Sequence, residues 1–575
     1  MTLERIPLCQ PIESRTNSLN QDSKSSNCYF ETREGRKDNI KRPGRTTVTL
    51  TGSPPTNKAA QGLYAWNNYL YAVVNNTVYK ISSSNVSTSI GSISGTATNN
   101  VSWKETATVP WLTIHNDSNF YIVSTAGSMY NTFSQVAAAL PSGAGSGYVV
   151  GDVLAVVGGG VGEAATLQVT SIGSGGSVTG LSVVTPGNYY SMPAMPAATS
   201  ATTGSGLGCT VNLSAAIAFF PSGPYAKGTV YLDGYIFIAT QAGRIYNSSI
   251  ENPVGWNALN YISAAAEPDP IVGIAKHFNY LVAFGTYSTE FFYDAGNATG
   301  SPLAKYDSAR LEIGCIAGSS IVEMEQTLMW VGAAKGHGKS VYMLDGLSPA
   351  RISDQYIEKY LNADNTDNFV AYAYKIAGHT FYILTLRSSD LTFVYDLNEK
   401  AWYHWSTATA ATTAIVGLAI AGIAVAGSSG DAPKEHYYRP VFYTEFNNGY
   451  YLIDDVTGSI YIADTNVYLD SGDPIYWRVV TPRIDNGSTN RKFINRLEVV
   501  GDKVNATIQV RHSDDDYNTF SAWRQNNLNS DRVKFFQLGS TRRRSYEFLC
   551  LDNVPLRLGS AEIDFDIGYL EGGQG

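Results

Sequence analysis

The stretch GLYAWNNYLYAVVNNTVYKIS, residues 62–82, contains three short apolar segments separated by two Asn-Asn pairs. The segments are rich in Tyr, Val and Leu, which favour β-strands. Asn tolerates a positive φ angle, so an Asn-Asn pair suits the tight turn of a β-hairpin. The stretch therefore predicts three antiparallel strands joined by two short turns.

Similar units recur along the chain. VPWLTIHNDSNFYIVST (109–125) has an Asn-Asp turn, and GTVYLDGYIFIATQAGRIYNSS (228–249) has Asp-Gly and Ala-Gly turns. About six or seven such units follow one another at a spacing of a few tens of residues, a periodicity that is typical of a β-propeller. A set of packed β-sandwiches is the alternative. The recurring order of strand, turn, apolar strand, glycine turn and Tyr-containing strand favours the propeller.

We predict an all-β fold: a β-propeller core, an inserted small glycine-rich β module and a C-terminal antiparallel, β-sandwich-like region. A single helix is predicted at residues 354–363, where apolar side chains share one helical face. The expected boundaries are 1–60 for an extended N-terminal arm, 61–141 and 214–465 for the propeller, 142–213 for the inserted module and 466–575 for the C-terminal domain.

Composition excludes some classes of function. The chain has 575 residues, 54 glycines and 38 tyrosines, and only 15% of its residues are charged. Low charge indicates a surface that is partly covered by copies of the chain or by partners. The net charge of −9 argues against a general nucleic-acid binder. An acidic or neutral wall that encloses DNA without gripping it is compatible with this charge, because few phosphate contacts form.

The glycine-rich region around Gly158-Gly159-Gly160 does not predict a phosphate-binding loop. Such a loop joins a strand to a helix, whereas here strand-like sequence follows strand-like sequence. The GHGK stretch at 336–339 has the wrong glycine spacing and is also followed by a strand pattern. We interpret residues 142–213 as a self-contained β module inserted into the propeller.

No catalytic constellation is recognisable, and we predict that the chain is not an enzyme and uses no cofactor or metal. The five dispersed cysteines indicate reduced thiols rather than disulfides. Asp514, Asp516 and Asn518 have the alternating spacing of a weak ion site, but a solvated hairpin turn is the preferred interpretation. The first residues lack the apolar core of a secretion signal.

An uncharged stretch, ATAATTAIVGLAIAGIAVAGSSG, spans residues 408–430. Its length suits a membrane span, but most of it is Ala, Thr and Gly. Three interpretations stay open: a transmembrane helix, a segment packed against another subunit, and a segment that meets a membrane only during a functional event. The candidate contact residues of this segment are its strongly apolar ones: Ile415, Val416, Leu418, Ile420, Ile423 and Val425.

Basic residues gather in two places, near residues 33–45 and in the TRRRS run at 541–545. Solvated loops are the simpler interpretation, and contact with an acidic neighbour or a phosphate is the functional one. The candidate partner-contact residues are Arg33, Arg36, Lys37, Lys41, Arg42, Arg542, Arg543 and Arg544.

Several pieces of the chain resemble one protein family. They include VYMLDGLSPARISDQYIEKYLN (341–362) and the segment that ends in YDLNEKAWYHW (395–405). The pieces NCYFE…KRPG near the N-terminus and RHSDDDYNTFS…RRRSYEF near the C-terminus also fit. The pattern resembles the tail hub or nozzle proteins of short-tailed phages, which are also called packaged-DNA stabilisation proteins. Residues 142–213 and 408–430 depart from the family pattern. With the resemblance, we expect the first to contact a neighbouring subunit or a tail fibre, and the second to form a closure or lumen loop through the apolar candidates named above.

The resemblance implies a structural virion protein that is made in the host cytoplasm and forms a ring in the tail. The ring would have six copies, lie below the portal and adaptor rings, channel double-stranded DNA without reading its sequence, and retain it until ejection. Implied partners are the head-to-tail adaptor ring, tail fibres or spikes, a needle or plug, and in passing the host envelope. The alternative is a tail fibre or a receptor- or glycan-binding propeller, including a glycan-degrading enzyme.

Overall fold

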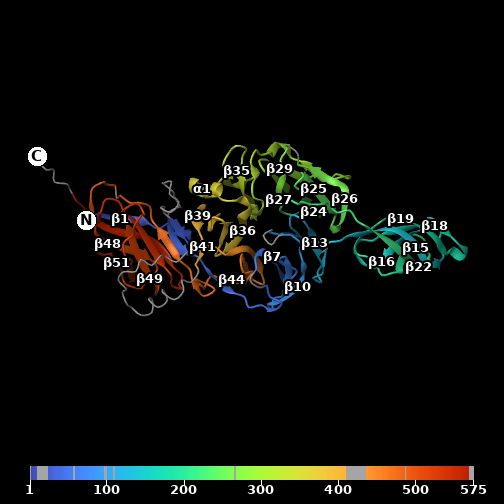
Figure 1. Cartoon of the computed structure of the whole chain (residues 1–575), viewed down its shortest axis with the longest axis horizontal. Helices are drawn as coiled ribbons and strands as arrows, with labels where there is room; N and C mark the ends of the chain where they lie inside the picture. The colour runs from blue at the N-terminus through green and yellow to red at the C-terminus, as the bar shows by residue number, and fades with distance from the viewer. Residues whose placement is uncertain are drawn as a thin grey trace.

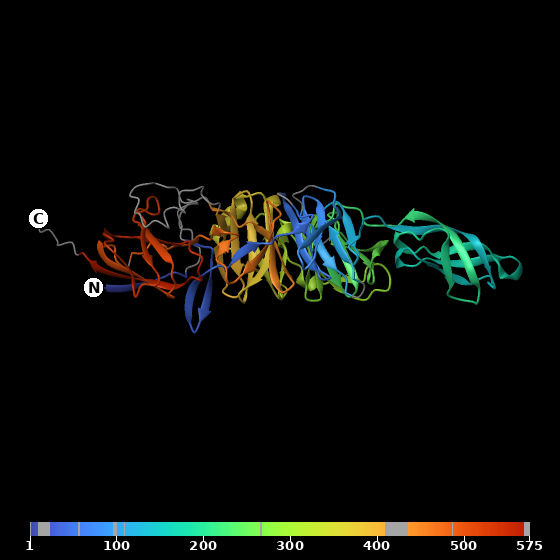
Figure 2. The same ribbon diagram turned by 90° about the horizontal axis from the view of Figure 1, so that it is seen from below.

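The computed structural model of the chain describes residues 2–9, 24–55, 58–95, 100–107, 110–264, 267–408, 435–485 and 487–568. Within these residues the fold is almost entirely β, with one α-helix, α1 (Gln355–Ala363). Figures 1 and 2 show three bodies in a row: a C-terminal domain, a propeller in the middle and an inserted module. The first and last described strands, β1 (Thr2–Pro7) and β54 (Arg557–Ile567), both lie in the C-terminal domain, and the module lies at the opposite end of the molecule.

The first blade of the propeller contains residues 62–82, in β7 (Ala60–Trp66), β8 (Tyr69–Val74) and β9 (Thr77–Ile81). These strands pair antiparallel, and β10 (Val86–Ser92) completes the blade. Both residues of each Asn-Asn pair have a positive φ, between 47° and 66°. The two tight turns that the asparagines predict are therefore confirmed.

Six further sheets of the same kind follow, so the described residues form a β-propeller of seven blades. The inner strand of each blade lies beside the inner strand of the next, and the last lies beside the first. In ring order the inner strands are β7, β11 (Ser102–Glu105), β23 (Val230–Leu232), β27 (Ile271–His277), β32 (Val322–Met324), β36 (Phe369–Ile376) and β42 (Pro440–Phe446). The β-propeller predicted from the sequence is confirmed.

The remaining strands complete the blades outward from this ring. In blades two to four they are β12 (Leu112–His115), β13 (Phe120–Val123) and β14 (Met129–Tyr130), then β24 (Tyr235–Ala239), β25 (Arg244–Ser249) and β26 (Asn252–Ser263), then β28 (Tyr280–Gly285), β29 (Thr289–Asp294) and β30 (Leu303–Lys305). In blades five to seven they are β31 (Gly314–Cys315), β33 (Thr327–Ala333), β34 (Ser340–Asp345) and β35 (Ser348–Arg351), then β37 (His379–Leu386), β38 (Leu391–Asp396) and β39 (Ala401–His404), then β43 (Gly449–Asp454) and β44 (Ile460–Asp464).

Helix α1 joins blades five and six at the position that its sequence predicts. Asp354 caps it by accepting a hydrogen bond from the backbone N–H of Ile357. Its buried side chains are Tyr356, Ile357 and Leu361, which pack into the core shared by the two blades. The helix therefore serves packing between blades.

The seventh blade takes its outer strand from the beginning of the chain. Strand β5 (Gly44–Thr47) pairs antiparallel with β44, and β6 (Thr51–Gly52) then pairs with β10 of the first blade. The N-terminal segment thus closes the propeller ring. We expected an extended arm over residues 1–60. The local sequence could not indicate these strand pairings, because the pairing residues lie about 400 positions away.

The C-terminal domain also includes N-terminal strands. One sheet contains β48 (Lys492–Gly501), β51 (Val533–Phe536), β52 (Ser540–Thr541) and β54 (Arg557–Ile567), to which β1 (Thr2–Pro7), β3 (Cys28–Arg33) and β4 (Arg36–Lys41) are added. The other contains β47 (Trp477–Val480), β53 (Ser545–Cys550), β49 (Thr507–Ser513) and β50 (Arg524–Asn527). Strand β2 (Lys24–Ser26) joins β47 to β39 of the sixth blade, so one sheet runs from the propeller into this domain.

The inserted module begins and ends inside a long hairpin of β15 (Ser134–Ser146) and β22 (Leu207–Ile217). Its other strands are β16 (Val153–Val157), β17 (Gly160–Glu163), β18 (Thr166–Ile172), β19 (Val178–Thr185), β20 (Asn188–Ser191) and β21 (Ala197–Ala201), all in one sheet with β15 and β22. The module has an apolar core of its own. The hairpin places its ends at 134 and 217, outside the expected limits of 142 and 213. The added parts, SQVAAALP and SAAI, are rich in alanine and lack the alternation that marks a strand in the sequence.

Candidate interface residues and the propeller channel

The N-terminal segment is held in the propeller by a buried ion pair. The guanidinium of Arg42 donates two hydrogen bonds to the Asp470 carboxylate, at 3.0 Å and 2.6 Å, and a third to the side-chain oxygen of Asn27 at 2.8 Å. Arg42 and Asp470 are both buried. Burial alone would raise the pKa of Asp470, but the neighbouring guanidinium groups outweigh it and hold this pKa below its ordinary value.

Arg45, on β5 itself, extends this cluster. Its Nη1 lies 3.4 Å from the Asp470 carboxylate, and its guanidinium carbon lies 5.0 Å and 4.8 Å from the ring centres of Tyr438 and Tyr461. Bidentate pairing and cation–π contact both demand a fixed arrangement of the groups. We call Arg42, Arg45 and Asp470 the clasp. The sequence analysis missed Asp470, because a lone carboxylate in a turn gives no signal of its partner.

Three of the eight predicted contact residues are buried inside the chain. Besides Arg42 these are Lys41, whose Nζ donates to the backbone oxygen of Asp552 at 2.7 Å, and Arg544, which pairs with both carboxylate oxygens of Asp514 at 2.7 Å. Burial lowers the pKa of Lys41 to about 8. The prediction that these three contact a partner at the surface is corrected: a cation in a strand-rich region is as easily an internal anchor as a surface group, and spacing alone does not separate the two.

The other five predicted contact residues reach the surface. Arg36 pairs with Asp38 at 2.8 Å, Lys37 lies 3.3 Å from Glu399, and Arg33 pairs with Glu31. All three lie on the β3–β4 hairpin, which pairs with β54 only at its base and projects from the body of the molecule (Figure 2). Arg542 and Arg543 are exposed in the turn before β53. Their contact with a partner stays a prediction.

The predicted closure loop lies outside the described residues, and so do its candidates Ile415, Val416, Leu418, Ile420, Ile423 and Val425. The chain enters and leaves this segment through a two-stranded ladder of β40 (Ser406–Ala408) and β41 (Glu435–Tyr437). In the part of the chain that the structure describes, no helix has both the length and the apolar character needed to cross a membrane.

The propeller has a cavity of about 620 Å³ at its centre, lined by residues in or next to the inner strands of all seven blades. Its charged side chains are of both signs: Lys104 lies 3.9 Å from Glu323, and Lys227 donates to the backbone oxygen of Asn100 at 2.7 Å. The volume is that of a small-ligand pocket, about 300–1,000 Å³. Duplex DNA, whose major groove alone is about 12 Å wide, does not fit through such a space.

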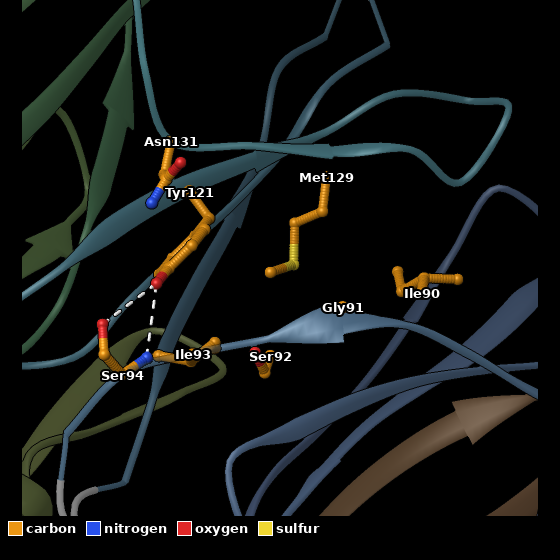
Figure 3. Close-up of a pocket in the computed structure, with 8 residues that line it drawn as sticks. All are labelled: Ile90, Gly91, Ser92, Ile93, Ser94, Tyr121, Met129 and Asn131. Atoms are coloured by element: carbon orange, nitrogen blue, oxygen red, sulfur yellow. Dashed lines mark hydrogen bonds between the residues drawn. The ribbon is translucent and has the colours of Figure 1, made fainter.

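A second cavity, of about 390 Å³, lies between the first two blades (Figure 3). The Tyr121 hydroxyl points across it and hydrogen-bonds with Ser94 at 3.3 Å. No carboxylate, histidine, cysteine or lysine lines it. The lining residues are Ile90, Gly91, Ser92, Ile93, Ser94, Tyr121, Met129 and Asn131. This set offers no acid–base pair for catalysis.

A third cavity, of about 290 Å³, lies where the sixth blade meets β41. His436 hydrogen-bonds with the Asp390 carboxylate at 2.9 Å. His404, on the same wall, is buried, and burial lowers its pKa to about 3. His404 therefore stays neutral throughout the physiological range and does not itself exchange a proton there.

The carboxylates at 514–516 are engaged separately and do not converge. Asp514 pairs with Arg544, Asp516 lies 2.7 Å from Arg483, and Asp515 accepts hydrogen bonds from Thr519 in the same turn. Within the described ranges no group of three or more His, Cys, Asp or Glu side chains is placed to hold a metal ion. The GHGK stretch forms the turn between β33 and β34, as its strand context predicts.

Residues 212–428 match the family model described as "Bacteriophage P22 Gp10, beta-propeller". No match is found among curated proteins. The match begins inside β22, so most of the inserted module lies outside it.

Solved structures give only weak similarity. A virginiamycin B lyase from Staphylococcus aureus has a TM-score of 0.35 at 6% identity, covering 73% of this chain and 98% of its own. BamB from Moraxella catarrhalis has a TM-score of 0.34 at 8% identity, covering 73% of this chain and 97% of its own. The Neurospora crassa Pan2 WD40 domain has a TM-score of 0.33 at 7% identity, covering 71% and 89%. Their activities carry nothing over to this chain.

The family match agrees with the resemblance found in the sequence, and it falls on the propeller that the strand pairings define. Its 217 residues include blades three to six, together with helix α1. Over these residues the chain is similar to the family described as "Bacteriophage P22 Gp10, beta-propeller", which supports a phage structural protein.

Proposed function

We propose that copies of this chain assemble into a ring, of six copies, in the tail of a short-tailed phage. The ring lies below the head-to-tail adaptor, guides the genome during ejection and helps to retain it before infection. The family match on the propeller carries this proposal. The low proportion of charged residues supports it, because a chain that is covered by copies of itself needs fewer charges at its surface.

The size of the propeller channel argues for a lumen between copies rather than through one chain. A cavity of about 620 Å³, crossed by the Lys104–Glu323 pair, leaves no passage for a duplex. The propeller of each chain then forms one segment of the ring wall. The net charge of −9 suits a wall along which DNA slides, because phosphates find few cations to bind.

The role is structural and not enzymatic in this proposal. Glycoside hydrolysis needs two carboxyl groups about 5–10 Å apart in a cleft that admits the sugar. The two carboxylates of the central cavity are Glu323, paired with Lys104, and Glu445, which accepts a hydrogen bond from the Tyr443 hydroxyl. The alternative function that the experiment has to exclude is that of a glycan-binding tail protein.

The test is electron microscopy and mass photometry of the purified chain, alone and mixed with the adaptor ring of its virion. We expect closed rings, formed either by the chain alone or on the adaptor. Virions assembled without the chain should lose DNase-protected DNA. A chain that stays monomeric in both samples and hydrolyses or binds glycans would contradict the proposal.

A further inference from the structure

His379 is a buried histidine that pairs with a buried carboxylate. It begins β37 of the sixth blade, and its Nδ1 lies 2.8 Å from the carboxylate of Asp396, the last residue of β38. An ionised carboxylate only accepts hydrogen bonds, so the Nδ1–H of His379 donates to it. The imidazole ring also stacks on the ring of Phe381, with 5.7 Å between the two centres. Both contacts fix the position of the imidazole within the blade.

Asp396 also organises the turn that follows it. Its second carboxylate oxygen accepts hydrogen bonds from the backbone N–H groups of Asn398 at 2.9 Å and Glu399 at 3.3 Å. The Glu399 carboxylate in turn accepts from the N–H of Thr32 on β3 at 2.9 Å and from the Thr32 hydroxyl at 2.8 Å. The Nζ of Lys37, on β4, lies 3.3 Å from the same carboxylate. The sixth blade therefore holds the β3–β4 hairpin through the turn that Asp396 organises.

The hairpin contacts the histidine ring as well. The ring centre of Tyr29, on β3, lies 4.9 Å from that of His379, and the ring planes meet at 62°, an edge-to-face arrangement. Strands β3 and β4 belong to a sheet of the C-terminal domain, so these contacts connect that domain to the propeller. We call them the hairpin joint, which consists of the residues Tyr29, Thr32, Lys37, His379 and Glu399.

Negative charge acts on His379 from both sides of the hairpin joint. Asp396 and Glu399 contribute it from the blade, and Glu31, on β3, contributes it from the hairpin. Burial by itself lowers the pKa of His379, but the hydrogen bond to Asp396 and the three carboxylates outweigh burial and raise this pKa above its ordinary value. The ring of Tyr29 adds no charge, because burial raises the pKa of its hydroxyl further above neutral pH.

The cations near the hairpin joint are already paired with carboxylates. Arg33 pairs with Glu31, and the guanidinium of Arg557 lies 3.8 Å from the same side chain. Lys37 pairs with the carboxylate in the turn of the sixth blade. Histidine is the side chain whose charge ordinarily changes between about pH 5 and 8. His379 is therefore the group of the joint that responds to pH near neutrality.

A neutral His379 keeps its hydrogen bond to Asp396 but no longer offsets the negative charge of Glu31 and Glu399 on the two sides of the joint. We propose that protonation of His379 tightens the hairpin joint, so that the C-terminal domain is held to the sixth blade more firmly below neutral pH than above it. Because the folded pKa is raised, this contribution is complete below the unfolded value of about 6.5 and is lost as the pH rises through the folded value. The inference does not depend on the proposed ring.

The test is hydrogen exchange of the full chain at about pH 6 and about pH 8, corrected for the intrinsic effect of pH on exchange. The amide of Thr32, which donates to Glu399, and its neighbours in the hairpin report on the joint. In the parent chain their protection should be at least about threefold greater at the lower pH. His379→Gln still donates a hydrogen bond but takes up no proton, so most of this difference should disappear. Lys41, whose pKa is about 8, titrates in both chains, and its contribution cancels in the comparison.

The matched control is His115→Gln. His115 is also buried, but it lies in the second blade, and its two ring nitrogens lie 3.0 Å from the backbone oxygens of Asn116 and Gly228. This variant should keep the pH dependence of the hairpin. Nuclear magnetic resonance of the histidine-labelled parent is a second measurement that needs no variant: the imidazole in contact with Tyr29 should titrate above about pH 6.5. Titration of this imidazole below that value, hairpin protection in the parent that does not fall as the pH rises, or an equal fall in His379→Gln would overturn the proposal.

Discussion

Two regions look alike as additions to the propeller, yet they are built in opposite ways. The N-terminal segment, residues 24–52, forms strands in the C-terminal domain, the sixth blade, the seventh blade and the first blade. The inserted module, residues 134–217, keeps all eight of its strands in one sheet and has its own core. The N-terminal segment adds strands to the C-terminal domain and to the propeller, whereas the module is connected by its two chain ends and only touches the third blade, through β17 and β20.

The two regions differ in the residues to which their hydrogen bonds and buried ion pairs connect them. The clasp pairs Arg42 and Arg45 with Asp470, which lies more than 400 residues further along the chain. All three side chains are buried. At the base of the module, the N–H of Ala218 donates to the oxygen of Phe133 at 3.0 Å, so the two chain ends are already adjacent. Removing the module leaves a short gap, whereas removing the N-terminal segment leaves open blades and an unpaired buried carboxylate.

The largest effect should come from deletion of the two regions. Deleting residues 24–52 removes the outer strand of the seventh blade, so we expect loss of the cooperative thermal transition. Deleting residues 134–217, with Phe133 and Ala218 joined by Asn-Gly, should keep the propeller transition within a few degrees of the parent. Circular dichroism and calorimetry measure both. A propeller that melts normally without residues 24–52 would refute the comparison.

Breaking the clasp should have the next largest effect. Arg42→Ala leaves Asp470 buried without its main partner, and removal of one partner from a buried ion pair costs about 3–5 kcal/mol. The matched control is Arg310→Ala, which breaks the exposed pair with Glu267 and should cost less than about 1 kcal/mol. Urea denaturation gives both values. Equal effects of the two substitutions would show that the clasp adds nothing to closure.

The module should unfold independently of the propeller. Leu154→Ala opens a cavity in the module core and should lower only the module transition, by about 2–5 kcal/mol. Leu384→Ala, in the core shared by blades five and six, should lower only the propeller transition by a similar amount. Two-transition calorimetry separates them. A single transition that moves with either substitution would mean that the module is integral to the core.

The smallest effect concerns pH and Lys41. Its folded pKa of about 8 lies below the unfolded value near 10.4, so the unfolded chain binds more protons between these values. Its destabilising effect is full below pH 8 and is relieved as the pH rises toward 10.4. We therefore compare the free energy of unfolding of Lys41→Met with that of the parent. The difference should favour the variant by about 1–3 kcal/mol more at pH 7 than at pH 10. A stability difference that does not change with pH would show that Lys41 is not titrated by folding.

Local features of the fold could be predicted from the sequence, and remote pairings could not. The Asn-Asn turns, helix α1 and the repeated blades depend on residues within about 40 positions of each other. Strand β5, GRTT, has no apolar alternation, and only its pairing with β44 makes it a strand. The basic residues could be found in the sequence, but Lys41, Arg42 and Arg544 are buried because of partners that the sequence does not reveal.

The central claim, that the N-terminal segment is a working part of the propeller and the module is not, is tested most directly by native-state hydrogen exchange in rising denaturant. The amides of residues 44–47 should open with those of 460–464, with the same free energy and the same dependence on denaturant. The amides of 153–157 in the module should form a separate unit. Early, denaturant-independent exchange of residues 44–47, or opening of the module together with the propeller, would contradict the account.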